Sequence, residues 1–115
     1  KLSPRKIMMD TRDRVEEVGK NIDANKGVFI PDNKTLLNDY ITPEELWACT
    51  SCNACVEECP VNISPLSIIM DMRRYLVMEQ SAAPMSLNAM MTNVENNGAP
   101  WQYSQQDRLN WKNEN

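Results

Sequence analysis

The chain has 115 residues, with 12 lysines and arginines against 16 aspartates and glutamates, and it contains four cysteines and no histidine. This length fits one core, so we expect residues 1–115 to form a single domain. The absence of histidine excludes Cys2His2 zinc sites, Rieske clusters and Ser-His-Asp catalysis. The net charge of −4 and the lack of a long apolar run argue against nucleic-acid binding and a membrane span.

The first helix is predicted from Ser3-Pro4, a capping residue followed by proline at the first helical position. Apolar residues at helical spacing continue to Gly19, so we expect a helix over about residues 4–18. Residues 20–41 are rich in Asn, Asp, Gly and Pro, which predicts a loop. Within it, residues 28–30 form either a short extended stretch or a loop that buries an apolar anchor.

Two more helices have the same kind of start. Thr42-Pro43 with Glu45 forms a capping box, and this helix leads directly into the cysteines. Ser64-Pro65 opens the most apolar helix, which carries apolar residues on more than one face and is therefore expected at the centre of the core. These residues are Leu66, Ile69, Met70, Tyr75, Leu76 and Val77.

A C-terminal helical tail is predicted over residues 84–115. It contains a helix over residues 85–96 that stops at Gly98, and a last short helix capped by Ser104. Four apolar side chains of the first of these helices are expected to turn inward: Leu87, Met90, Met91 and Val94. Because no segment alternates like a strand, the sequence predicts an all-α fold of four to five helices around a cysteine-rich loop.

An internal repeat relates residues 3–15 to residues 64–76 by a shift of 61 residues (from 3 to 64). Six of the first ten positions are identical after this shift, including the Ser-Pro pair. One helix pattern used twice would produce part of this agreement, but a duplication explains it better. Since the second copy directly follows the cysteines, we expect a matching cysteine motif upstream of Lys1, in a larger protein from which this domain is excised.

All four cysteines lie in the predicted cluster-binding segment, residues 47–60: Cys49, Cys52, Cys55 and Cys59, followed by Pro60. This Cys-x2-Cys-x2-Cys-x3-Cys-Pro spacing is that of bacterial [4Fe–4S] ferredoxins, in which the fourth cysteine binds the other of two clusters. We therefore expect all four to be metal ligands. In a two-cluster protein Cys59 would serve the second cluster, so the 115-residue chain alone is expected to bind iron weakly or not at all.

Other uses of the cysteines fit the spacing less well. Structural zinc usually takes two cysteine pairs a dozen or more residues apart, and a disulfide framework spreads its cysteines along the chain. A single redox dithiol leaves two cysteines unexplained. Two alternatives stay open, a structural or protein-interaction domain in which a metal or cluster is only a staple, and a thiol redox sensor.

The chain resembles the α-helical ferredoxin-type modules of Fe–S oxidoreductase subunits. Examples are heterodisulfide reductase C/D-like proteins and the iron–sulfur subunits of glycolate oxidase and anaerobic glycerol-3-phosphate dehydrogenase. The matching stretches are residues 46–60, 72–77 and 95–101, together with residues 3–13. The family pattern has a second cysteine motif just upstream of a Ser-Pro helix, which this sequence lacks.

The resemblance implies an α-helical ferredoxin-like fold and a non-catalytic electron-transfer role within a multi-subunit oxidoreductase. It implies two [4Fe–4S] clusters in the intact parent, with a cluster absent or incomplete in this fragment. The implied partners are a cysteine-rich or flavin-containing catalytic subunit and a membrane electron carrier subunit. The implied location is the cytoplasm, at the inner face of the cell membrane.

Three further features have competing interpretations. Trp47 either shields a cluster from water or is a core aromatic, and the sequence favours neither. Arg73 and Arg74 are interpreted as solvated helix charges rather than as neighbours of a cluster. The methionines at helical spacing are interpreted as core packing residues rather than as ligands.

Overall fold

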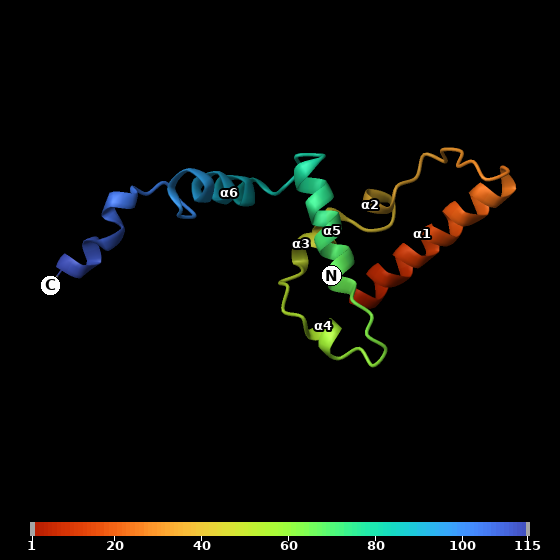
Figure 1. Ribbon diagram of the computed structural model, residues 1–115, viewed down its shortest axis with the longest axis horizontal. Coiled ribbons are helices and arrows are strands. Elements are labelled where there is room, and N and C mark those ends of the chain that lie inside the picture. The colour runs from red at the N-terminus through yellow and green to blue at the C-terminus, as the bar shows by residue number, and fades with distance from the viewer. Residues whose placement is uncertain (1, 115) are drawn as a thin grey trace. The chain divides into compact units, whose positions relative to one another are not determined.

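The computed structural model describes residues 2–114, and its regular structure in that range is entirely helical (Figure 1). The helices are α1 (Pro4–Ala24), α2 (Leu36–Asp39), α3 (Pro43–Ala48), α4 (Ala54–Glu57), α5 (Pro65–Met78), α6 (Met85–Asn97) and the 3₁₀-helix η1 (Gln105–Asn113). The prediction of an all-α fold is confirmed. The helices outnumber the expected four to five because α2 and α4 have four residues each, too few to show a periodic pattern.

The chain divides into two compact units, Lys1–Glu79 and Gln80–Asn115. The division falls just before residue 84, where the sequence predicts a helical tail. None of the helices within residues 2–114 combines the length and the apolar character that crossing a bilayer requires.

The three proline-capped helix starts are confirmed. The Ser3 hydroxyl accepts a hydrogen bond from the Lys6 backbone N–H at 3.3 Å, and Ser64 accepts one from Ser67 at the same distance. The repeated Ser-Pro pair therefore builds the same cap twice. At the start of α3, Thr42 makes the predicted capping box.

The predicted end of the first helix was wrong, because α1 continues through Gly19 to Ala24. A glycine inside a helix costs about 1 kcal/mol relative to alanine but does not have to end it. The chain turns instead at Lys26 and Gly27, whose φ angles of 57° and 87° are left-handed. Residues 28–30 then form an exposed loop rather than a strand or a buried anchor.

The core lies in the first unit, where α5 contacts α1, α3 and α4. Six buried apolar side chains form it: Ile7, Leu37, Ile41, Leu46, Ile69 and Leu76. The central position predicted for α5 agrees with these contacts. However, α5 buries Ile69 and Leu76 on one face only, and Met70 and Tyr75 from the predicted set are exposed.

A salt bridge fastens the loop after α1 to that helix. The buried guanidinium of Arg14 donates to the two carboxylate oxygens of Asp32 at 2.7 and 3.0 Å, and to the carbonyl oxygen of Lys34 at 2.8 Å. These hydrogen bonds from Arg14 lower the pKa of Asp32 from 3.8 to about 2. The ionised carboxylate is therefore favoured in the folded chain.

This salt bridge predicts a pH-dependent part of the stability. Because the pKa of Asp32 is lowered by folding, its contribution should be complete above about pH 4 and lost as the pH falls towards 2. Urea unfolding at several pH values should show that Asp32→Asn lowers the midpoint at pH 6, and that the difference from the unmodified chain shrinks as the pH is lowered from 4. An equal difference at all pH values would contradict this role of the carboxylate.

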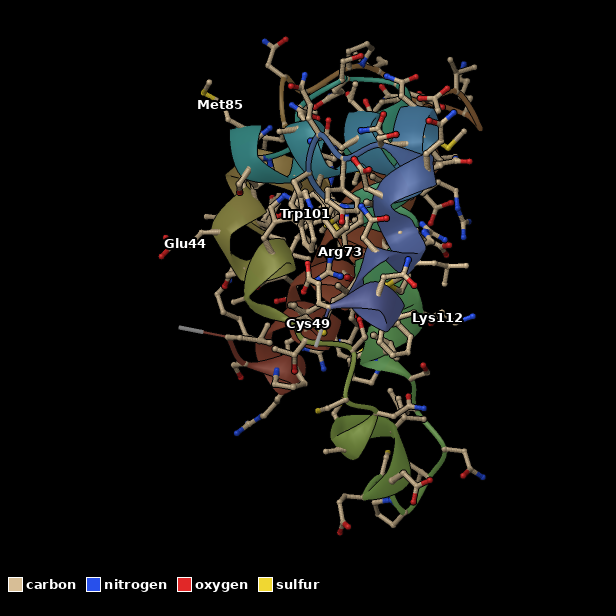
Figure 2. The ribbon with its side chains drawn as sticks, turned by 90° about the vertical axis from the view of Figure 1, so that its left-hand side faces the viewer. Glu44, Cys49, Arg73, Met85, Trp101 and Lys112 are labelled. Atoms are coloured by element: carbon tan, nitrogen blue, oxygen red, sulfur yellow. The ribbon has the colours of Figure 1, made fainter. Side chains whose placement is uncertain are left out.

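The second unit buries none of its described side chains. The prediction that Leu87, Met90, Met91 and Val94 turn into a core was therefore wrong. Met85, which is 89% exposed, projects from the start of α6 (Figure 2). The predicted stop at Gly98 is confirmed, since this residue has a left-handed φ of 71° and donates its N–H to the carbonyl of Val94.

Candidate metal centre in the cysteine loop

The helix that leads into the cysteines is fixed to α1 at its N-terminus. The carboxylate of Glu45 accepts a hydrogen bond from the Thr42 backbone N–H at 2.8 Å and forms an ion pair with Lys6 of α1 at 2.8 Å. Burial works to raise the pKa of Glu45, but the hydrogen bonds from Lys6 and Thr42 outweigh it and lower this pKa overall. The start of α3 is thus held by a buried, ionised side chain.

The other end of α3 is fixed to α5 by Arg73. The Arg73 guanidinium donates to the carbonyl oxygens of Leu46 and Cys49, and it lies over the ring of Trp47, 5.0 Å from the ring centre. Cys49 directly follows α3 in an extended conformation. Its backbone therefore leaves a helix that is anchored at both ends. The interpretation of Arg73 as a solvated helix charge was therefore wrong. The same interpretation agrees with the structure for Arg74, whose side chain is 66% exposed.

The chain curves tightly around Cys52. Ser51 and Asn53, on either side of it, have left-handed φ angles of 58° and 70°. This conformation costs roughly 1–2 kcal/mol for a residue other than glycine, and asparagine tolerates it best. Helix α4 starts directly after Asn53 and carries Cys55, so the curvature turns two cysteines toward the same side of the loop.

Backbone N–H groups point at three of the four sulfurs. Ser51 donates to the Cys49 sulfur at 3.4 Å, and Ile63 donates to the Cys59 sulfur at 3.3 Å. The pKa of the Cys52 thiol lies below its usual value because the N–H of Ala54 donates to it, with a further hydrogen bond from Thr50. Such donors stabilise thiolates, the form in which cysteine binds metals, and they tune the potential of iron–sulfur clusters.

The four cysteines line two cavities, which share Cys55. Cys49, Cys52 and Cys55 line a cavity of about 180 Å³ together with apolar side chains that include Leu66 and Ile69, and Cys52 is exposed. Cys59 lies outside this set and lines a second cavity, of about 340 Å³, together with Cys55. The other residues of that second cavity are Pro4, Arg5, Met8, Met9, Ile63 and Pro65.

The donor set fits an iron–sulfur cluster better than a single metal ion. Within residues 2–114, no three Cys, Asp or Glu side chains lie close enough together to hold one ion. A cubane cluster presents a separate iron atom to each thiolate, so its ligands surround a cavity rather than meet at a point. Cys49, Cys52 and Cys55 have this arrangement, and sulfur is the usual cluster ligand.

The sequence predicted the cysteines but missed the residues that hold them. The roles of Arg73 and Lys6 depend on contacts with α3, which is distant from both in sequence. The internal repeat could have drawn attention to Arg73, because it aligns this residue with an identical one, Arg12. The two arginines are used differently in the structure, since Arg12 is 57% exposed and pairs with the adjacent Asp13.

The profile of the 4Fe-4S dicluster domain matches residues 3–63. The chain is 40% identical over 82 residues to the probable iron-sulfur-binding oxidoreductase FadF of Bacillus subtilis, covering 71% of the chain and 12% of that protein. It is 37% identical over 100 residues to the EtfAB:quinone oxidoreductase of Syntrophomonas wolfei, covering 87% of the chain and 14% of that protein.

A third relative is a heterodisulfide reductase C-like protein of Archaeoglobus profundus. It is 33% identical over 49 residues, which cover 43% of the chain and 26% of that protein. The chain thus spans only 12% and 14% of the length of FadF and the quinone oxidoreductase. No solved structure matches it.

Proposed function

The chain belongs to the 4Fe-4S dicluster domain family, and from this premise we propose that it is an electron-transfer iron–sulfur module whose cysteines share two clusters. Cys49, Cys52 and Cys55 supply three thiolates to one [4Fe–4S] cluster, whose fourth ligand comes from another part of the intact protein. Cys59 supplies one thiolate to a second cluster. The observation that supports this proposal is that Cys49 and Cys52 line one cavity and Cys59 lines the other, with Cys55 between them in the lining of both.

The residues of this chain bind and orient the clusters. The anchored helix α3 fixes Cys49, the tight turn at Ser51 and Asn53 presents Cys52, and α4 presents Cys55. The N–H groups directed at sulfur stabilise the thiolates, and apolar side chains form most of the walls of both cavities. When bound, a cluster supplies one-electron transfer.

The clusters need partners that deliver and remove electrons. We propose two partners that exchange electrons with this module. One is a cysteine-rich or flavin-containing catalytic subunit, and the other is a membrane electron carrier subunit. The names of two relatives support this proposal, since they describe oxidoreductases, one of them with a quinone. In this arrangement the module lies in the cytoplasm, at the inner face of the membrane.

Iron and sulfide analysis tests the function directly. The full-length protein, purified without oxygen, should be brown, contain iron and acid-labile sulfide in equal amounts, and lose its colour reversibly on reduction. A colourless protein with one zinc ion would instead support a structural or protein-interaction domain in which the metal only stabilises the fold. A reversible disulfide without iron would support a thiol redox sensor, and either result would overturn the electron-transfer proposal.

A further inference from the structure

Arg73 and Arg74 are neighbours in α5 with opposite surroundings. The Arg74 side chain is exposed and pairs with Asp71 of the same helix at 3.1 Å. The Arg73 guanidinium instead reaches α3, with Nε 2.9 Å from the Leu46 oxygen and Nη2 2.5 Å from the Cys49 oxygen. Two adjacent residues of the same type therefore provide a natural comparison.

The acceptors of Arg73 are carbonyl groups at the end of a helix. The last carbonyls of a helix have no partner inside it, and a side chain that donates to them stabilises the helix end. The planar guanidinium donates in two directions at once, to Leu46 and to Cys49, while its face covers Trp47. Lysine has the same charge but lacks this planar fork.

We propose that Arg73 is a positioning residue for the cluster at Cys49 and that it raises the reduction potential of this cluster. This inference rests on the function proposed above. Arg73 holds the Cys49 carbonyl and so fixes the backbone that carries the sulfur. Its positive charge lies beside a ligand of the cluster, and reduction adds a negative charge there, so the reduced form is stabilised.

The test measures the potentials of both clusters in the full-length protein with its clusters bound. Arg73→Gln should make the potential of one cluster more negative and alter the electron paramagnetic resonance spectrum of that cluster only. Arg74→Gln removes the same charge one residue away and should leave both potentials unchanged. Arg73→Lys keeps the charge and should give an intermediate potential with an altered spectrum.

The outcomes separate this inference from the proposed function. Equal shifts in Arg73→Gln and Arg74→Gln would overturn the positioning role, because charge alone would then explain them. Unchanged potentials in Arg73→Gln with full iron content would also overturn it. If Arg73→Gln does not fold, Arg73→Lys tests the positioning role instead. A spectrum and a potential identical to those of the unmodified protein would then reject this role. A colourless unmodified protein would overturn the proposed function itself.

Discussion

Replacing Cys52 by alanine in the full-length protein is expected to remove one cluster and to lower the iron content from roughly eight to roughly four atoms per chain. Cys52 lines the smaller cavity with Cys49 and Cys55 and does not line the larger one. Its loss leaves that cluster without one of its thiolates. Iron analysis with electron paramagnetic resonance should show the remaining cluster with its spectrum preserved.

Cys59→Ala is the matched comparison, because Cys59 lines the larger cavity and not the smaller one. It should remove the other cluster and preserve the one that Cys52→Ala destroys. The two variants should therefore have complementary spectra. If both variants lost the same cluster and kept the same other one, Cys52 and Cys59 would be ligands of a single cluster, and the division between two cavities would be wrong.

Leu46→Ala is expected to lower the free energy of unfolding of the Lys1–Glu79 unit by about 2–5 kcal/mol. Leu46 has no exposed surface and belongs to a small core cluster of six buried side chains within residues 2–114, so neighbouring residues have little capacity to fill the space left by it. It also lies in α3, between the capping box and Cys49. Urea unfolding followed by circular dichroism would measure the loss.

Leu109→Ala is the control for this substitution. Leu109 is 56% exposed and lies in η1 of the other unit, so the same change of side chain should alter the unfolding midpoint very little. A loss of less than about 1 kcal/mol in Leu46→Ala would contradict the core described for this unit.

Features of the fold that depend on neighbouring residues could be predicted from the sequence. The starts of α1, α3 and α5 were predicted correctly because a capping side chain and a proline act within one turn of the helix. The end of α1 was not, because a glycine inside a helix resembles one that ends it. Helices α2 and α4 escaped prediction because they have only one turn each.

Features that depend on distant contacts could not be predicted. The apolar spacing in α6 shows that Leu87 and Met91 share a face, but it does not show whether anything covers that face. The partners of Arg73 lie 27 and 24 residues away, so nothing near it in the sequence separates it from Arg74. The cysteine spacing predicted both the kind of site and the separate role of Cys59, whereas the two cavities and the residues that line them required the structure.

The double anchoring of α3 has a consequence for the speed of electron exchange. Lys6 of α1 pairs with one end of this six-residue helix, and Arg73 of α5 donates to the other end. Cys49 therefore follows a helix that is bonded to both α1 and α5. Electron transfer becomes slower when the ligands of a cluster must move as the charge of the cluster changes. If Cys49 ligates a cluster, these contacts would limit the movement of its thiolate as the charge of the cluster changes, and a small movement would keep the reorganisation energy of electron transfer low.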